Sequence, residues 1–403
     1  MAGPLDGIRV LDMSRVLAGP WAGQLLGDYG ADVVKLERPD RGDETRAWGP
    51  PWLSNAGKHE SAYFLSTNRN KRSITVDFSS DDGRVLAAEL ASEADILIEN
   101  YKSGTLDRYG LGAKTLTSQN PKLIYCSISA FAQDSSKARE PGYDAMIQAS
   151  AGLMSITGAA DTEGGGPQKV GVAIADIMAG MYAATAILAA LAKRGQNDKG
   201  QFIEVPLYDS QVAWLANQNM NYLIGGTAPR RRGTAHPNIV PYQVFPTRDG
   251  HLMLAVGNDR QFAACVQCLN VPALAKDIRF AGNADRLQNR EELIALLSKA
   301  FRARDSAEWL ERLSDCSVPC GPINDIEQVF KSDYANERAL VRQLKHPYDD
   351  AMPTVANPSR FSATPVSYRK APPLLGQHTA EILADWLGYS AEKIAHLKSV
   401  GAV

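Results

Sequence analysis

An α/β fold built around a mostly parallel sheet is the class that the sequence predicts, and three observations indicate it. Short strand-like runs alternate with helical patterns through the first half of the chain, as they do in βαβ units. The first run, Ile8–Met13, is apolar and β-branched, which is typical of a strand covered on both faces. At 403 residues the chain is also too long for one ordinary domain, so two lobes are expected.

The elements of the first lobe follow in order along the chain. The predicted strands are Ile8–Met13, Asp32–Glu37, Arg72–Phe78, Asp95–Glu99, Leu123–Phe131 and Gln201–Pro206. The predicted helices are Trp21–Tyr29, Asp81–Ser92, a long apolar helix that follows Asp176, and Ser210–Gly225. We expect the long helix to stop at Lys193-Arg194-Gly195, because two cations and a glycine favour a helix C-terminus.

A smaller second lobe is predicted after an irregular Gly, Pro and Arg-rich stretch, Gly225–Pro237, which is a candidate linker or active-site loop. Its predicted elements are a strand over His251–Val256 and helices over Asp259–Leu269, Asp285–Phe301 and Ser306–Asp315. Prolines and an amphipathic helix over Thr379–Leu387 follow. We therefore expect a large Rossmann-like domain from residues 1–220, a smaller α+β domain from 225–325, and a return to the large domain over 330–403.

Composition excludes several classes of protein. The formal net charge is −2 and no basic block is present, so nucleic acid is not an expected partner. Five cysteines argue against a disulfide framework and for a reducing compartment. Cys265 and Cys268 form a CxxC without a second pair at zinc spacing, so we interpret them as structural thiols and expect no metal.

A cytoplasmic protein is expected from the N-terminal segment and from the apolar runs. Met-Ala-Gly-Pro-Leu-Asp has neither the basic nor the apolar region of a signal peptide. The longest apolar run, Ile177–Ala192, is shorter than the ~20 residues that span a bilayer. We expect this run to be a buried helix and expect no membrane partner.

Polar residues follow several predicted strands at the edge where ligands bind in parallel sheets. These residues are Ser14-Arg15, Glu37-Arg38, Glu99-Asn100 and the segment from Ser129 onward. A nicotinamide dinucleotide does not fit this edge, because the first turn lacks the three glycines of the phosphate-binding fingerprint. No P-loop and no G-x-S-x-G elbow occur either.

Asp176 is the most informative single residue. It lies in the apolar segment Val170–Gly180, where a carboxylate is costly to bury without partners. One interpretation is a helix N-cap. The other is a nucleophile, and the two are compatible because first-turn amides and the helix dipole favour an ionised carboxylate. Residue patterns alone leave both open.

The residues then match a known family in many places. The matching segments are Pro4–Asp12, Leu17–Pro20, Asp32–Pro39, Gly42–Arg46, Asn70–Ile74, Glu99–Tyr101, Leu106–Gly110, Pro141–Asp144, Val318–Ile323 and Pro372–Thr379. In this order they resemble the family III CoA-transferases over nearly the whole chain. The resemblance implies an enzyme that moves coenzyme A from an acyl-CoA to a carboxylic acid, with no metal and no nucleotide cofactor, and an interlocked homodimer.

The resemblance also implies roles for residues. Asp176 is the expected nucleophile, which carries first the acyl group and then the coenzyme as an aspartyl-CoA thioester. Gly142, Tyr143 and Asp144 match the loop beside the nucleophile. The positions that match coenzyme contacts are Val16, Leu17, Arg38, Val76, Phe78, Ser79, Asn100, Tyr101, Lys102 and Arg108. The cations among them suit phosphate, and Phe78 suits base stacking.

Two kinds of observation indicate the substrate class: positions where this sequence differs from the formyl-CoA enzymes of the family, and one loop. Leu17 stands where the formyl-CoA enzymes have Gln, and Ser79 replaces a basic residue. The glycine run of those enzymes is also missing, so oxalate or formate is not expected. The segment Gly233–Phe245 resembles the loop of succinate/glutarate-type CoA-transferases. One of three arginines, with His236, is therefore expected to bind the distal carboxylate of a dicarboxylic acid; the three are Arg230, Arg231 and Arg232.

Two alternatives to CoA transfer fit the same fold less well. An α-methylacyl-CoA racemase has the same fold but needs a His before the Asp of the loop, where this chain has Tyr143. Phenol, with an unperturbed pKa near ~10, is a poor base at neutral pH. A catalytically inactive acyl-CoA-binding protein would lose the nucleophile, whereas Asp176 is retained.

Overall fold

The computed structural model describes residues 2–403, which divide into two compact units. Unit 1 consists of residues up to Leu153, Val170–Gly225 and Tyr334–Val403; unit 2 consists of Met154–Lys169 and Gly226–Asp333. The short segment 154–169 joins unit 2 although the chain on both sides of it belongs to unit 1. No sequence pattern indicated this excursion.

Unit 1 contains a six-stranded sheet in the order β5-β2-β1-β6-β7-β8, and every neighbouring pair is parallel. The predicted parallel sheet is therefore confirmed. The strands are β1 (Arg9–Asp12), β2 (Asp32–Glu37), β5 (Lys71–Thr75), β6 (Ile96–Glu99), β7 (Ile124–Ser129) and β8 (Gln201–Pro206). Two antiparallel hairpins are added to this unit: β3 (Trp52–Asn55) with β4 (Lys58–Ser61), and β12 (Val341–His346) with β13 (Asp349–Val355).

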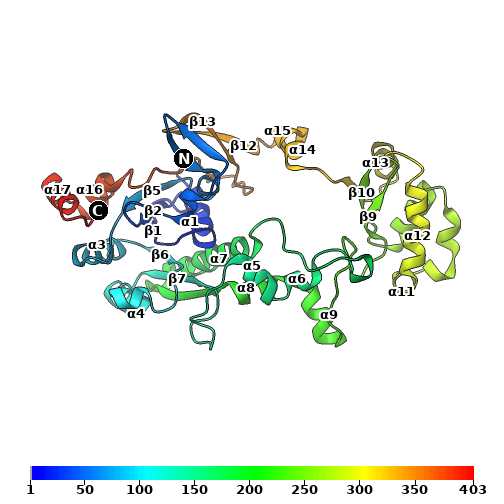
Figure 1. Cartoon of the computed structure of the whole chain (residues 1–403), viewed down its shortest axis with the longest axis horizontal. Helices are drawn as coiled ribbons and strands as arrows, with labels where there is room; N and C mark the ends of the chain where they lie inside the picture. The colour runs from blue at the N-terminus through cyan, green and yellow to red at the C-terminus, as the bar shows by residue number, and fades with distance from the viewer. Residues whose placement is uncertain (1) are drawn as a thin grey trace. The chain divides into compact units, whose positions relative to one another are not determined.

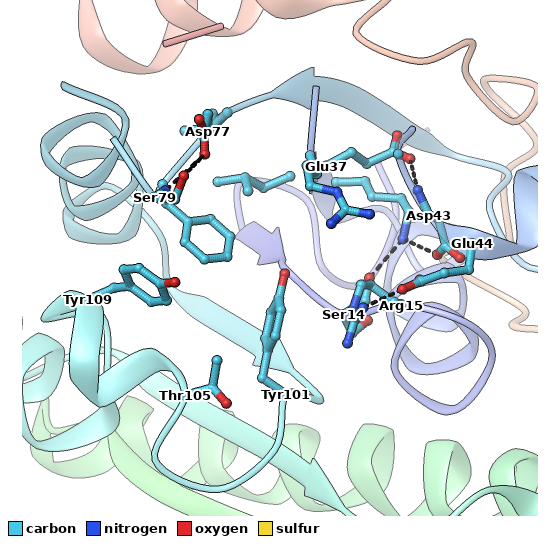
Figure 2. A pocket seen from close by; sticks show the side chains of 16 residues that line it. Ser14, Arg15, Glu37, Asp43, Glu44, Asp77, Ser79, Tyr101, Thr105 and Tyr109 are labelled. Atoms are coloured by element: carbon cyan, nitrogen blue, oxygen red, sulfur yellow. Dashed lines mark hydrogen bonds and ion pairs between the residues drawn. The ribbon is translucent and has the colours of Figure 1, made fainter. Parts of the chain in front are cut away.

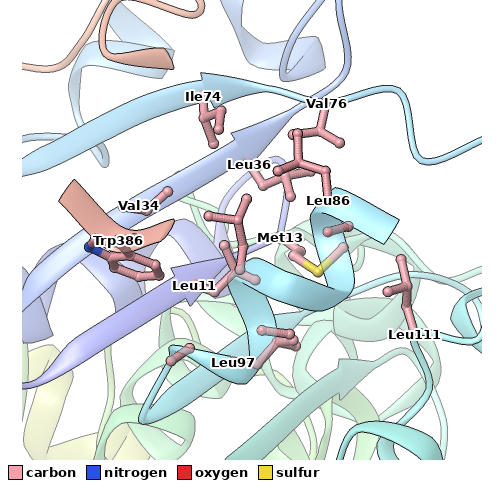
Figure 3. Packing of buried hydrophobic residues seen from close by; sticks show 14 of the residues in the cluster. Leu11, Met13, Val34, Leu36, Ile74, Val76, Leu86, Leu97, Leu111 and Trp386 are labelled. Atoms are coloured by element: carbon pink, nitrogen blue, oxygen red, sulfur yellow. The ribbon is translucent and has the colours of Figure 1, made fainter. Parts of the chain in front are cut away.

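Helices cover both faces of the sheet, so the strands are apolar on both sides. One face packs against α3 (Asp81–Ser92), α4 (Ala113–Gln119), α16 (Thr379–Leu387) and α17 (Ala391–Ser399). Figure 3 shows this face, where Leu11, Val34 and Ile74 of three adjacent strands gather with Leu86 of α3 and Trp386 of α16. The C-terminal helices thus complete a core that the N-terminal strands begin, and Figure 1 shows these red helices beside the blue strands of the sheet.

The other face packs against α1 (Ala18–Asp28) and α7 (Ile174–Asn197). Small residues on α7 allow this contact to be close: a Cβ placed on Gly180 would meet the Ala18 carbonyl oxygen at 2.5 Å. By length and composition α7 could cross a membrane, but a buried core helix passes the same test. Its buried positions, Ala175 to Ala190, belong to the core of unit 1, which explains the Ala and Gly in this run.

Further helices of unit 1 are α2 (Ala62–Leu65), α5 (Asp144–Ser150), α8 (Leu207–Trp214) and α9 (Asn217–Gly225). The predicted single helix Ser210–Gly225 is therefore wrong. The helix breaks between α8 and α9, where Ala216 has a φ of 48°. The helix α1 also begins at Ala18, three residues before the predicted start, because Pro20 is tolerated in a first turn whose amide needs no helical partner.

Unit 2 is an α+β unit around the antiparallel sheet β11-β10-β9. Its elements are β9 (Tyr242–Pro246), β10 (His251–Ala255), β11 (Cys320–Pro322), α10 (Asp259–Cys268), α11 (Asn283–Gln288), α12 (Arg290–Phe301), α13 (Ser306–Asp315) and α14 (Ile326–Lys331). The predicted helix Asp285–Phe301 is two helices that meet at Asn289. Cys265 and Cys268 are buried free thiols of α10.

Candidate active site at the carboxyl ends of the strands

The carboxyl-end edge of the unit 1 sheet carries two pockets. The first, of about 260 Å³, is lined by Asp176 and by residues after β1, β6 and β7. The second, of about 280 Å³, is lined by residues after β1, β2 and β5. Arg15, Glu44 and Tyr101 line both pockets. We call the first the nucleophile pocket and the second the nucleotide pocket.

The turn between β1 and α1 is held in a strained conformation at the border of these pockets. Val16 has a φ of 69°, which a β-branched residue rarely adopts. Its N–H donates to both Asp43 carboxylate oxygens at 3.2 Å. Asn100 accepts from the Arg15 N–H at 2.8 Å and donates to the Arg15 carbonyl at 2.7 Å. The amide of Asn100, an expected coenzyme contact, is thus engaged with the backbone of this turn.

Asp176 lies at the third position of α7, in its first turn. The N-cap position belongs to Ala173, so the interpretation of Asp176 as an N-cap is wrong. The first-turn amides bind another carboxylate: Asp144 Oδ1 accepts from Ala175 N–H at 2.8 Å and from Asp176 N–H at 3.4 Å. These amides are therefore not hydrogen-bonded to the Asp176 carboxylate, contrary to the prediction from the sequence.

The electrostatic environment of Asp176 opposes its charge. Burial, followed by the nearby Asp144 carboxylate, raises the pKa of Asp176 to about 7. The same two carboxylates affect Tyr63 of α2. Burial and the carboxylates of Asp176 and Asp144 raise the pKa of Tyr63 to about 12. The phenol of Tyr63 therefore stays protonated at neutral pH and can donate a hydrogen bond. Nothing in the sequence distinguished Tyr63 from an ordinary helix residue.

The loop before α5 also reaches the nucleophile pocket. Gly142 and Tyr143 line it, and Tyr143 is 68% exposed. A Cβ on Gly142 would lie 2.6 Å from the Ala130 Cβ, so glycine permits the close approach of this loop to the end of β7. Asp144 follows as the first residue of α5 and turns toward α7. Trp48 lines the same pocket and packs edge-on against Tyr63, with ring centroids 5.2 Å apart.

The nucleotide pocket contains several of the expected coenzyme residues. Figure 2 shows Tyr101 and Tyr109 at its wall and the Ser79 hydroxyl bonded to Asp77. Phe78 meets Tyr101 and Tyr109 edge-on, with centroids 5.8 and 5.3 Å away. The expected residues that line this pocket are Arg38, Val76, Phe78, Ser79 and Tyr101. Those that line the nucleophile pocket are Val16, Leu17, Asn100, Tyr101 and Lys102, whereas Arg108 is exposed and lines neither.

The charges around the nucleotide pocket are mostly paired. Lys35 is fully buried, binds Asp43 at 2.9 Å and donates to the Ser14 carbonyl at 2.9 Å. Arg15 pairs with Glu44. Among the described residues that line the two pockets, Arg38 and Lys102 have no carboxylate partner. Their charges are therefore available for an anionic group such as a phosphate.

The expected carboxylate-binding residues lie in unit 2 and differ in their partners. Arg231 pairs with Asp161 of the segment 154–169 and is largely buried, while Arg230 and Arg232 are exposed. His236 Nδ1 accepts from the Asn238 N–H at 3.1 Å. Burial and the nearby Arg290 lower the pKa of His236, so this imidazole is neutral at pH 7 and can donate only through Nε2.

Comparison with known proteins gives one consistent family. Residues 5–379 match the family model described as CoA-transferase family III. The chain is 47% identical over 384 residues to the succinate–glutarate CoA-transferase of Agrobacterium fabrum, covering 95% of each chain. It is 42% identical over 400 residues to the Homo sapiens succinyl-CoA:glutarate CoA-transferase, covering 99% of this chain and 90% of that one. A solved CAIB/BAIF family protein from Brucella suis superposes with a TM-score of 0.85 at 44% identity, covering 96% of this chain and 100% of that one.

Proposed function

Because this chain belongs to CoA-transferase family III and is a CoA-transferase, we propose that it transfers coenzyme A to a dicarboxylic acid through an aspartyl-CoA thioester on Asp176. The observation that carries the proposal is the position of Asp176 in a pocket that shares Arg15, Glu44 and Tyr101 with the nucleotide pocket. The names of the relatives, succinate–glutarate and succinyl-CoA:glutarate CoA-transferase, support dicarboxylates of four to six carbons such as succinate, glutarate or a branched relative as donor acid and acceptor.

The chemistry proceeds through four acyl transfers. The Asp176 carboxylate attacks the donor thioester carbonyl, which gives a mixed anhydride and the coenzyme thiolate. The thiolate attacks the aspartyl carbonyl, which releases the donor acid and leaves aspartyl-CoA. The acceptor carboxylate attacks that thioester, and the released thiolate then attacks the acceptor carbonyl to give the new acyl-CoA and free Asp176. The thioester's free energy is kept on the enzyme throughout.

The residues around Asp176 suit these steps. Each tetrahedral intermediate develops an oxyanion that needs donors. Leu17 and Ala18 line the pocket at the start of α1, whose first-turn amides have no helical partner. The protonated phenol of Tyr63 is a further donor. Arg38 and Lys102 are the unpaired cations for the coenzyme phosphates, and Phe78 with Tyr101 and Tyr109 forms an aromatic wall for the base.

A covalent adduct tests the proposal directly. The wild-type enzyme incubated with succinyl-CoA alone is expected to form an adduct on the peptide that contains Asp176, and hydroxylamine is expected to release it. Peptide mass spectrometry before and after hydroxylamine measures both steps. An adduct on another residue, or turnover without any adduct, would contradict the mechanism.

The loop arginines give a prediction about the acceptor. We propose that one of Arg230, Arg231 and Arg232 holds the distal carboxylate of the acceptor, with His236 as a neutral donor. The pairing of Arg231 with Asp161 supports Arg230 or Arg232 as the free guanidinium. Replacing the binding arginine by Met is expected to cost about 2–4 kcal/mol in kcat/KM for a dicarboxylic acceptor alone. A monocarboxylic acceptor of equal length is the control, and Arg231→Met is expected to weaken both acceptors equally.

An interlocked homodimer is the proposed assembly. Apolar side chains are exposed on α9 and along residues 323–334, a density that is unusual for a free surface. They are Met220, Tyr222, Leu223, Ile224, Ile323, Ile326, Val329, Phe330 and Tyr334. Chains that pass through one another cannot separate without unfolding. Mass photometry at nanomolar concentration is therefore expected to show only dimers, and a monomer peak that grows on dilution would contradict this.

A further inference from the structure

The Asp176 carboxylate has no hydrogen-bond donor from the protein within residues 2–403. The free first-turn amides of a helix are normally bound by a side chain at the N-cap, but the N-cap residue of α7 is Ala173, which has no side-chain acceptor. Here Asp144 Oδ1 accepts the N–H groups of Ala175 and Asp176 at 2.8 and 3.4 Å. Asp144 stands 32 residues before Asp176 in the chain and belongs to another helix. The helix that carries the nucleophile is thus capped from outside.

Gln148 fixes Asp144 in this position. It lies one turn further along α5, on the same face of the helix, and is fully buried. Its Nε2 donates to Asp144 Oδ2 at 2.7 Å, and its Oε1 accepts from the Val170 N–H at 2.9 Å. One face of α5 therefore holds both the segment that leads into α7 and the first turn of α7 itself.

We propose that Asp144, held by Gln148, is a positioning residue that takes the N-terminal donors of α7 away from Asp176 and so keeps the carboxylate of the nucleophile uncommitted and basic. This inference rests on the proposed role of Asp176 as nucleophile. A carboxylate that accepts two or three backbone N–H groups is stabilised as an anion and becomes less basic. A carboxylate whose lone pairs are unbound keeps them for attack on a thioester carbonyl.

The charges near Asp176 agree with this assignment. Burial and Asp144 raise the pKa of Asp176 to about 7. The other charged or titratable groups that line the nucleophile pocket are Arg15, Glu44, Tyr101, Lys102, Glu140 and Tyr143, and Tyr63 faces Asp176 from α2 as a neutral phenol. Because the reactive form of Asp176 is ionised, the first acyl transfer is expected to increase as the pH rises through about 7.

Asp144→Asn separates the charge of Asp144 from its capping role. The amide oxygen of Asn can still accept the α7 N–H groups, but the negative charge beside Asp176 is gone. The measurement is the rate of adduct formation from succinyl-CoA alone between pH 5 and 9, since the ionisation of an acceptor acid then does not enter. The acidic limb of the profile is expected to move down by about half a pH unit or more, and the high-pH plateau is expected to fall several-fold.

Two further variants show whether a changed pH profile comes from Asp144 and its contact with Gln148. Asp325→Asn is the matched control, because Asp325 caps α14 by accepting the Gln328 N–H at 2.8 Å and lines neither pocket; its profile is expected to equal that of the wild type. Gln148→Leu is expected to lower the plateau and to move the acidic limb down as well, because a loosened Asp144 frees the N–H groups of α7 to stabilise the ionised Asp176 carboxylate.

The outcomes distinguish this inference from the proposed function. If Asp144→Asn loses rate without a shift of the acidic limb, Asp144 is only structural and the inference is overturned. If Asp144→Asn does not fold, Asp144→Ser keeps a capping oxygen without charge, and the same shift is expected from it. If the wild-type enzyme forms no hydroxylamine-sensitive adduct on Asp176, the proposed function fails, whatever the Asp144 variants show.

Discussion

Asp176→Asn is expected to lower kcat for CoA transfer by about 10⁴-fold or more, because an amide cannot form the anhydride or the aspartyl-CoA thioester. Coenzyme binding is expected to remain, since the unpaired cations Arg38 and Lys102 and the aromatic wall around Phe78 are unchanged. Steady-state transfer rates and calorimetric binding of free coenzyme A measure the two effects separately. Loss of both would point to a structural role.

The same variant is expected to keep or raise the melting temperature at pH 8. The folded-state pKa of Asp176 is about 7, above its ordinary value of 3.8. Above pH 7 the ionised carboxylate therefore opposes folding, and a neutral amide removes this cost. Asp209→Asn, in the first turn of α8 and exposed, is the control for both activity and stability. Full activity of Asp176→Asn would refute the mechanism.

Breaking the buried pair of Asp12 and Lys71 is expected to have the largest effect on stability. Both side chains are fully buried below the turn that carries Val16. The Lys71 ammonium donates to Asp12 Oδ2 at 2.8 Å and to the Pro20 carbonyl and Asn68 Oδ1 at 2.9 Å each. Burial lowers the pKa of Lys71 to about 8, and the two lysines Lys71 and Lys35 outweigh burial to lower that of Asp12. The pair is thus ionised at pH 7.

Lys71→Met is expected to lower the free energy of unfolding by about 3–5 kcal/mol, because it leaves a buried carboxylate without its main partner. The double variant Asp12→Leu/Lys71→Met is expected to cost less than the sum of the single variants, since an uncharged pair avoids the unpaired charge. Denaturant unfolding at pH 7 and fixed protein concentration measures all three. Strict additivity would contradict this account of the pair.

Much of the sheet could be predicted because the residues that determine each strand or helix lie within that element and at its ends. The bounds of β2, β8, α3, α13 and α16 agree with the sequence prediction, since each has a clear period and clear end signals. The edge that carries Arg15, Arg38 and Asn100 follows from the rule that the carboxyl ends of parallel strands meet. Asp176 itself was indicated by its apolar setting together with the family resemblance.

What the sequence could not predict depends on contacts between distant residues. The cap on α7 comes from Asp144 of another helix, so no pattern near Asp176 could reveal that the first-turn amides are occupied. Lys35 and Lys71 lie in strands and would be expected at a surface, but carboxylates from other segments accompany them into the core. Trp48 lines the nucleophile pocket from an irregular part of the chain, and Tyr63 of the short helix α2 packs against Trp48. No local sequence pattern indicates that residues 154–169 belong to unit 2 either.

The C-terminal helices that close one face of the sheet have a consequence for synthesis. Translation delivers Leu11, Val34 and Ile74 long before Ile382, Leu383 and Trp386 exist. Arg72 of β5 likewise cannot form its ion pairs with Glu381 and Asp385 until these residues are made. The Asp32 carboxylate cannot accept the Trp386 indole N–H until then either. A ribosome-bound chain therefore exposes this apolar sheet face until residues 379–403 emerge. A polypeptide that stops before α16 is expected to keep the face exposed and to be a substrate of chaperones and proteases.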